Sequence, residues 1–285
     1  MDGNDTASRV AIITDSTSDL PDEICTQYEI TSVPLNVTID GETWLDGVMS
    51  QQEFFDRMRA AESLPTTSQP SVGAFVDVYA DALTRAAHVV SVHISSELSG
   101  TLTSAHAAAE RFAGKVTVID SRNLSWGLGF QVIEAAKAAL EGASLDAIVQ
   151  RTERARDRVE MLVGLDNLDN LVKGGRVGRV AGFVGSMLNL KVTLTVEDGA
   201  FEPIARTRGA KAALEHTVDW VAERMGTASK AAFCVMYALG EDRAASLAEA
   251  LQARFDVTEI HVVPTGSVIA THTGTGWGVA FLPEE

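Results

Sequence analysis

Hydroxyl side chains gather in four short stretches of this 285-residue sequence. The stretches are DSTSD (15–19), PTTSQPS (65–71), SSELSGT (95–101) and DSRNLS (120–125). Three of them directly follow apolar, β-branched runs, and the fourth enters a helical pattern. Serine and threonine hydroxyls, together with the N–H groups of helix N-termini, are neutral hydrogen-bond donors. The combination points to a small anionic or carboxyl-bearing ligand.

Each stretch also has an ordinary explanation, because Ser, Thr, Asp and Asn cap helices and form turns. Ser71, and either Ser18 or Asp19, are interpreted as helix caps. Three hydroxyl-rich loops at one edge of a sheet nevertheless supply more donors than three helices need. The ligand site is therefore inferred from the group of loops, not from any single residue.

The elements that must position these loops alternate between short strands and helical patterns. This alternation predicts βαβ units and a mostly parallel sheet in three layers, with helices on both faces. Ligands of such sheets bind at the carboxyl ends of the strands, where the hydroxyl-rich loops fall. The expected strands are VAIIT (10–14), SVPLNVTI (32–39), HVVSVHI (88–94) and KVTVID (115–120).

The pattern changes after about residue 158. The segment 166–190 predicts two short helices around the basic, glycine-rich sequence KGGRVGR (173–179). NLKVTLTV and AFEPIAR then predict an antiparallel hairpin that turns at Asp198 and Gly199. We expect an α/β protein with an α/β domain over residues 1–157 and a second α+β domain with a partly antiparallel sheet over residues 158–285. The last strand, GWGVAFL (276–282), could return to the first domain.

Composition excludes several classes of function. The formal net charge of −16 disfavours binding to nucleic acid. Cys25 and Cys234 lie far apart and have no zinc-ligand spacing, so we expect no metal and a reduced, cytoplasmic environment. The longest apolar stretch, AAFCVMYAL (231–239), is too short for a membrane span, and the N-terminus has no signal-peptide pattern.

Catalytic and nucleotide-binding motifs are missing from the sequence. There is no GxSxG, GxxxxGK[ST] or HExxH, and neither WGLGF nor GTGWG completes GxGxxG. Two further segments could bind a ligand. KGGRVGR contains three cations, but the end of a helix explains it equally well. ATHTGTGWG (270–278) places His272 among hydroxyls and glycines, and a tight turn is the competing explanation for this segment.

Taken together, these segments resemble the successive motifs of the DegV family. The resemblance covers essentially the whole chain, and the motifs follow in the family's order. One departure is Thr275 followed by Trp277, where the family commonly has smaller residues. The matching segments are ITDSTSDLP (13–21), PTTSQPS (65–71), ISSELSGTLTSA (94–105), VIDSRNLSWGLG (118–129), KGGRVGR (173–179), LNLKVTL (188–194) and HTGTGWG (272–278).

The resemblance implies that one fatty acid lies in a buried tunnel between two domains. It implies a substrate-binding subunit, not an enzyme, which presents the acyl carboxylate to a separate ATP-dependent fatty acid kinase. Neither a catalytic residue nor a cofactor is expected in the chain itself. By the resemblance, Thr67 and Ser96 match the family's contacts to the carboxylate, and His272 would lie near the same head group. Arg176 could help to hold an acyl phosphate. Arg206 would belong to the surface that docks the kinase. The neighbouring residues Thr66, Ser95 and Gly100 are assigned to the same ligand site.

Two alternatives stay open at this point. The protein could be a stand-alone hydrolase or phosphotransferase that uses Ser96 or His272 as its nucleophile, which would need an activating base and an orienting carboxylate nearby. It could also be a lipid carrier or sensor without a kinase partner. The residues that line the acyl chain, and hence the preferred chain length, do not follow from the sequence.

Overall fold

The computed structural model of the chain describes residues 9–183 and 190–284. Contacts within the chain divide it into two compact units. The first unit comprises residues 1–36 and 68–157, and the second comprises residues 37–67 and 158–285. The expected boundary after residue 157 coincides with one of these divisions, whereas residues 37–67 group with the second unit. The assignment of two functional domains remains a prediction.

The first unit is built on a four-stranded, all-parallel sheet with the order β2-β1-β6-β7. Its two central strands are almost entirely buried, as expected of parallel strands covered on both faces. The strands are β1 (Val10–Asp15), β2 (Ile30–Val33), β6 (His88–His93) and β7 (Val116–Asp120).

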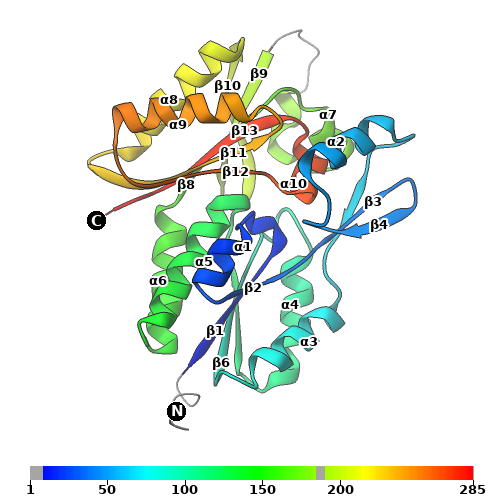
Figure 1. Cartoon of the computed structure of the whole chain (residues 1–285), viewed down its shortest axis with the longest axis vertical. Helices are drawn as coiled ribbons and strands as arrows, with labels where there is room; N and C mark the ends of the chain where they lie inside the picture. The colour runs from blue at the N-terminus through cyan, green and yellow to red at the C-terminus, as the bar shows by residue number, and fades with distance from the viewer. Residues whose placement is uncertain (1–8, 184–189, 285) are drawn as a thin grey trace. The chain divides into compact units, whose positions relative to one another are not determined.

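Helices cover both faces of this sheet, which confirms the expected three layers (Figure 1). The helices α3 and α4 pack against each other and share a core with Ile13, Val33 and Val89. On the opposite face α5 packs against β1 and β6. The helices of this unit are α1 (Asp22–Gln27), α3 (Val72–Ala82), α4 (Thr101–Ala109), α5 (Ser125–Leu140) and α6 (Leu145–Arg158), with 3-10 turns η1 (Ser16–Ser18) and η2 (Glu110–Phe112).

One predicted strand is wrong in its extent. Residues 32–39 were expected to form a single strand, but the chain breaks between β2, which ends at Val33, and β3, which begins at Asn36. Pro34 lies at the break and has no N–H for a ladder hydrogen bond. The next N–H, that of Leu35, binds the Oγ atom of Ser16 at 3.1 Å. The break separates the parallel sheet from a second, smaller sheet.

The second unit contains a six-stranded mixed sheet with the order β10-β9-β8-β13-β11-β12. The last strand, β13, lies in its centre and runs antiparallel to both β8 and β11, so it stays in this unit. Only β11 and β12 pair in parallel, which confirms the expected partly antiparallel sheet. The strands are β8 (Glu160–Leu165), β9 (Leu190–Glu197), β10 (Ala200–Arg208), β11 (Lys230–Ala238), β12 (Asp256–Pro264) and β13 (Gly276–Pro283).

The turn between β9 and β10 is the predicted two-residue hairpin. Asp198 and Gly199 have φ angles of 50° and 80°, and Glu197 pairs with Ala200 across the turn. Positive φ at both central residues is the geometry that matches the twist of the flanking strands, and Asp-Gly adopts it readily. The register of this hairpin is therefore encoded locally.

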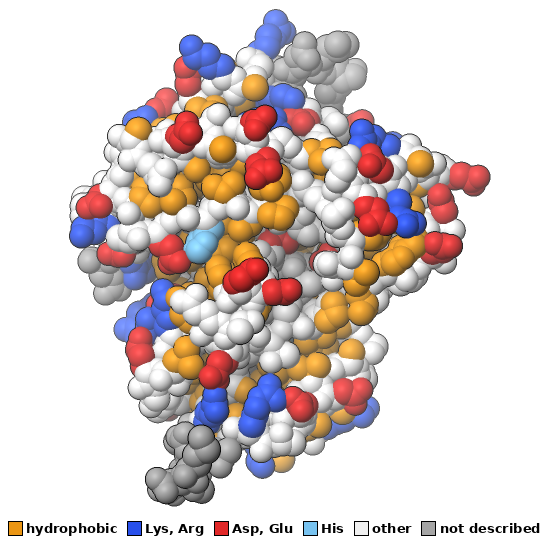
Figure 2. All heavy atoms as spheres, in the orientation of Figure 1, with side chains coloured by type: hydrophobic (Ala, Val, Ile, Leu, Met, Phe, Trp, Pro, Cys, Tyr) orange, Lys and Arg blue, Asp and Glu red, His pale blue; other side chains and the backbone are white. Residues whose placement is uncertain are grey.

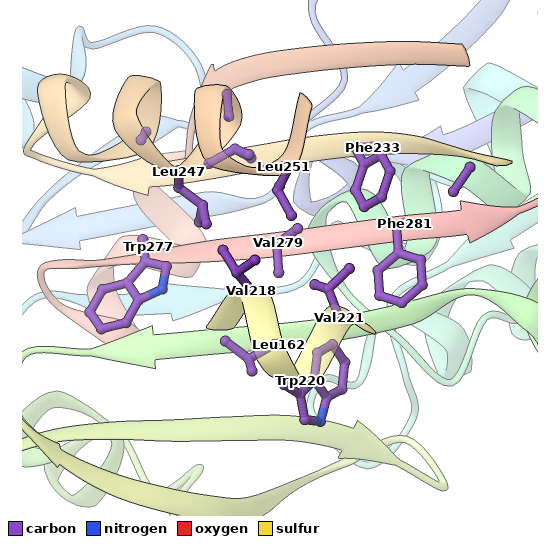
Figure 3. Packing of buried hydrophobic residues seen from close by; sticks show 14 of the residues in the cluster. Leu162, Val218, Trp220, Val221, Phe233, Leu247, Leu251, Trp277, Val279 and Phe281 are labelled. Carbon is purple, nitrogen blue, oxygen red and sulfur yellow. The ribbon is translucent and has the colours of Figure 1, made fainter. Parts of the chain in front are cut away.

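One face of the mixed sheet is covered by α8 (Ala210–Met225) and α9 (Glu241–Arg254). Figure 3 shows Trp277, Val279 and Phe281 on β13 projecting into this layer. Trp277 is 4% exposed, and its Nε1 atom donates to the Oγ1 atom of Thr217 at 3.2 Å. The large indole at position 277 is thus accommodated by the helix-covered core.

The remaining elements of the second unit carry the sequence segments around Thr67 and His272. They form a small sheet of order β4-β3-β5 and several short helices. Two short helices were expected in residues 166–190, and residues 184–189 of the second lie outside the described residues. These elements are β3 (Asn36–Ile39), β4 (Glu42–Leu45), β5 (Thr66–Ser68), α2 (Gln51–Ala60), α7 (Asp169–Lys173), η3 (Gly178–Phe183) and α10 (Ser267–Thr273).

Side chains of the segment 37–67 tie it to the mixed sheet. The amide of Gln51 donates to the carbonyl of Tyr237 at 2.8 Å and accepts from the N–H of Leu239 at 2.9 Å. Asp46 accepts from the hydroxyl of Ser267 at 2.6 Å and from the N–H of Val268 at 3.2 Å, which caps α10. These bonds explain why the segment groups with the second unit and fix the elements that carry Thr67 and His272.

The described helices include none that is both long and apolar enough to cross a membrane. Acidic side chains are spread over the face seen in Figure 2 and are interspersed with basic and apolar ones.

Candidate functional site

In the first unit, the hydroxyl-rich loops that follow β1, β6 and β7 are connected to one another by hydrogen bonds. Asp15 at the end of β1 accepts from the N–H of Ile94, in the loop after β6, at 3.1 Å. The loop after β7 meets the loop after β6 where the N–H of Ser95 donates to the carbonyl of Asn123 at 2.9 Å. The three loops therefore form one hydrogen-bonded group, as their positions in the sequence predicted.

Asp15 lies at one end of a fully buried chain of polar side chains. Its Oδ2 atom lies 2.9 Å from Nδ1 of His93, and Nε2 of His93 lies 2.7 Å from the Oγ atom of Ser91. The hydroxyl of Tyr79 donates to Ser91 at 3.0 Å. When Nδ1 carries the proton, the imidazole can donate to Asp15 and accept from Ser91 at Nε2, which satisfies every link of this chain. Burial is the main cause that raises the pKa of Tyr79 to about 12, so its phenol remains a donor.

Ser96, which we expected to contact the ligand's carboxylate, is exposed in the loop after β6. Its hydroxyl donates to Oδ2 of Asp120 at 2.6 Å, and its N–H approaches the same oxygen at 3.4 Å. The other carboxylate oxygen of Asp120 accepts from the N–H of Arg122 at 2.8 Å. Asp120, the last residue of β7, therefore holds the proposed donor in a charge-assisted hydrogen bond.

The two neighbouring candidates have identifiable local roles. Ser95 is fully buried, and its Oγ atom accepts from the N–H of Glu97 at 3.2 Å. Gly100 precedes the first turn of α4, and a Cβ atom at this position would lie 2.9 Å from the side-chain nitrogen of Gln69. Ser95 shapes the loop, and Gly100 allows Gln69 to approach the start of the helix. Their assignment to the ligand site stays a prediction.

In the second unit, the structure brings together Thr67 and His272, which are 205 positions apart in the chain. Thr67 lies in β5, and His272 lies in the last turn of α10. Their Oγ1 and Nε2 atoms are 2.7 Å apart. The two residues come from separate motifs, so this pairing links two predicted site residues directly.

The imidazole of His272 is held neutral. Burial, with a further contribution from the positive charge of Arg176, lowers its pKa to about 4. Its Nδ1 atom is buried and lacks a hydrogen-bond partner among the described residues. A neutral imidazole with its proton on Nε2 would donate to Thr67 and leave the threonine's own proton available to another acceptor.

The KGGRVGR segment packs directly against this histidine. A Cβ atom on Gly174 would lie 2.4 Å from Nδ1 of His272, so the glycine allows the close approach. The guanidinium of Arg176 donates to the carbonyl of Gly174 at 2.8 Å, which places this predicted site residue at the same turn. The segment is both the predicted end of a helix, α7, and a neighbour of the candidate site.

The other second-unit candidates lie on two strands. Thr66 is exposed beside Thr67 in β5, and Arg206 is exposed on β10, where it pairs in register with Val192. Thr275 donates to Asp166 at 2.8 Å, and Asp166 also binds Lys191 at 2.7 Å. These bonds stabilise the chain just after His272.

Sequence reasoning missed Asp120, Asp15 and His93 as parts of the site's framework. Asp120 could have been noticed as an acidic residue at the carboxyl end of a predicted strand. His93 gave a weaker signal, because it occupies a position in an otherwise apolar strand where polar side chains are usually satisfied in the core.

The enzyme alternative can be compared with this geometry. Ser91, His93 and Asp15 have the connectivity of a nucleophile, base and carboxylate, but all three are 0% exposed. Ser96 is accessible, but its described side-chain partner is the carboxylate of Asp120 and not an imidazole. Neither serine thus combines an accessible hydroxyl with a paired histidine. In the described parts of the chain, no three His, Cys, Asp or Glu side chains are grouped to hold a metal ion.

Comparisons with known proteins cover nearly the whole chain. A family model with the description "Uncharacterised protein, DegV family" matches residues 9–284. A DegV domain-containing protein from Deinococcus radiodurans is 39% identical over 280 residues, which cover 96% of this chain and 98% of the relative.

Solved structures are similar over the same extent. A structure described as fatty acid binding of a DegV family protein from Thermus thermophilus has a TM-score of 0.93 and 38% identity, covering 97% of this chain and 100% of that one. A DegV lipid-binding protein from Thermotoga maritima has a TM-score of 0.89 and 31% identity, covering 97% and 99%. The expected fold class is confirmed by these similarities.

Proposed function

The chain belongs to the DegV family, and on that premise we propose that it binds one fatty acid and presents the carboxylate to a separate ATP-dependent kinase. The structural neighbour from Thermus thermophilus, described as binding fatty acid, supports the ligand class. The interdomain tunnel, the formation of an acyl phosphate, the cytoplasmic location and the absence of catalysis by this chain itself belong to the same proposal and come from the family resemblance.

The observation that carries the proposal is the pairing of Thr67 with a neutral His272. A carboxylate that leaves water needs directed donors, because an unpaired buried charge is costly. Thr67 can supply such a donor, and Ser96 can supply a second through its hydroxyl. Neither hydroxyl forms a permanent ion pair with the head group, which suits a ligand that must later be transferred.

The acyl chain would provide most of the affinity. Burying each methylene group of a fatty acid contributes about 0.8 kcal/mol. The head-group contacts would then determine the orientation of the carboxylate and its readiness for phosphoryl transfer. Arg206 is proposed to contribute to the surface that docks the kinase, and Thr66, Ser95, Gly100 and Arg176 to complete the head-group site.

The first test is native mass spectrometry of the purified protein, followed by extraction and identification of any bound molecule. A retained fatty acid near one-to-one stoichiometry supports the proposal. A protein that is empty and also fails to take up added palmitic acid contradicts it.

A second test uses Thr67→Val and Ser96→Ala. We expect Thr67→Val to weaken palmitic acid binding about tenfold, because it loses one hydrogen bond to a charged group. We expect Ser96→Ala to weaken binding less, because Ser96 must exchange its bond to Asp120 for the bond to the ligand. Matched controls are Thr38→Val, in the neighbouring strand β3, and Ser246→Ala, on the exposed face of α9. If both site variants bind palmitic acid as the controls do, the assignment of these hydroxyls is wrong. Kinase dependence is tested separately by adding an ATP-dependent fatty acid kinase and measuring acyl phosphate.

A further inference from the structure

We propose that Asp120 competes with the ligand for the hydroxyl proton of Ser96, so that it sets the preference of the site for the charge of the head group. The inference rests on the proposed function, because it assumes that Ser96 binds the head group. It gives Asp120 a part in ligand selection, which neither the family motifs nor the predicted site residues assign to it.

The geometry places the carboxylate of Asp120 where a ligand's carboxylate would have to compete. Ser96 Oγ donates to Oδ2 of Asp120 at 2.6 Å, and Asp120 is partly buried at the end of β7. Its other oxygen is fixed by the N–H of Arg122 at 2.8 Å. The carboxylate is therefore held in place through the oxygen that does not bind Ser96.

A serine hydroxyl has only one proton to donate, and an ionised carboxylate can only accept. A bound fatty acid that receives this proton must displace the bond to Asp120. The ligand's negative charge then also lies close to that of Asp120, and like charges at such distances repel even near a protein surface. Asp120 thus opposes the head group in two ways, through the lost hydrogen bond and through charge.

Arg156, which binds the backbone of Asp120, makes its ion pairs with other carboxylates. Arg156 donates to the backbone carbonyl of Asp120 at 3.4 Å, whereas its ion pairs are with Glu153 at 3.5 Å and with Asp157 at 3.6 Å. Its charge is shared with two other carboxylates. The side-chain oxygen of Asp120 that faces Ser96 keeps its acceptor role.

A head group without charge meets a different environment. The hydroxyl of a fatty alcohol can donate to Asp120 or accept from Ser96, and it is not repelled by a carboxylate. In Asp120→Asn, the amide oxygen can still accept from Arg122, while the amide nitrogen can donate to Ser96 and release the serine's proton for the ligand. The substitution should therefore strengthen the binding of a fatty acid relative to that of a fatty alcohol.

The test compares palmitic acid and hexadecanol, which have the same chain length, on the wild-type protein and on Asp120→Asn. The measured quantity is the ratio of the two dissociation constants, which is insensitive to a general loss of folded protein. We expect Asp120→Asn to lower the dissociation constant of palmitic acid relative to that of hexadecanol about tenfold, equivalent to about 1.4 kcal/mol. Asp77→Asn removes the same charge from an exposed position on α3 and should leave the ratio unchanged.

The outcomes separate the two proposals. If the wild-type protein binds neither ligand, the proposed function fails. If it binds palmitic acid but Asp120→Asn changes the ratio no more than Asp77→Asn does, the competition is refuted. Should Asp120→Asn fail to fold, a crystal structure of the wild-type protein with palmitic acid decides: Ser96 Oγ must have left Asp120 for the ligand, and a retained bond to Asp120 overturns the inference.

Discussion

Replacing His93 with leucine tests whether the buried polar chain holds the first unit together. The substitution removes the imidazole that binds Asp15 at 2.9 Å and Ser91 at 2.7 Å. Asp15 is 0% exposed, so its carboxylate cannot recover the lost bond from water. A hydrogen bond to a charged group contributes about 1.5–3 kcal/mol and a neutral one about 1 kcal/mol. We expect a loss of about 3 kcal/mol in the free energy of unfolding.

His93→Asn distinguishes the contribution of this bond from that of packing. The amide nitrogen of asparagine occupies roughly the place of Nδ1, so it can still donate to Asp15, and only the bond to Ser91 is lost. The expected destabilisation is about 1 kcal/mol. Urea unfolding gives both values, and His106→Leu, at an exposed position on α4, serves as the control.

The assay can also follow the amide of Ile94, which donates to Asp15 at 3.1 Å. Its hydrogen exchange should accelerate in His93→Leu and remain slow in His93→Asn, because Asp15 loses its orientation only in the first variant. If leucine and asparagine destabilise the protein equally, the bond between His93 and Asp15 is not what holds the loop, and the reasoning is refuted.

Two further predictions concern His272. Its pKa is lower in the folded protein, about 4, than its ordinary value of 6.5, so the unfolded chain binds the proton more readily between these values. The stabilisation is complete above pH 6.5 and should be lost, by up to about 3 kcal/mol, as the pH falls towards 4. Denaturation curves at several pH values measure this loss. An unchanged pH dependence in His272→Gln would contradict the prediction. Gly174→Ala should destabilise the protein by about 1–3 kcal/mol, because its Cβ would lie 2.4 Å from Nδ1 of His272 and 2.8 Å from the carbonyl of Asn170. Gly182→Ala is the matched control, since its Cβ would meet no atom within 4 Å, and equal melting temperatures for the two variants would count against the close packing at Gly174.

The sequence predicted those turns and helix caps whose geometry depends only on neighbouring residues. The turn at Asp198 and Gly199 is an example, because the residues that adopt positive φ also set the register of their hairpin. Ser71 is another, since its hydroxyl accepts from the N–H of Ala74 at 3.1 Å as a helix cap. The break at Pro34 was missed because apolar alternation on both sides of the proline outweighed its missing N–H.

Features that depend on distant residues could not be predicted in the same way. The grouping of residues 37–67 with the second unit depends on Gln51, whose partners are 186 and 188 positions away. The bond between Ser96 and Asp120 depends on the pairing of β6 with β7, which places the ends of these strands side by side. Hydroxyl content showed where donors gather, but not that acceptors within the chain already engage them.

The two proposed donors therefore differ in what ligand binding requires of them. Thr67 is paired with a neutral imidazole, and the proton on that imidazole can reside on either nitrogen. When Nε2 donates to Thr67, the threonine's proton can pass to a ligand without the loss of the bond between the two residues. Ser96 is paired with a carboxylate that has no proton to give, so its bond to Asp120 must break before it donates elsewhere. Consequently, Thr67 is a donor that is ready in the free protein, whereas Ser96 becomes available only at a cost that depends on the charge at Asp120.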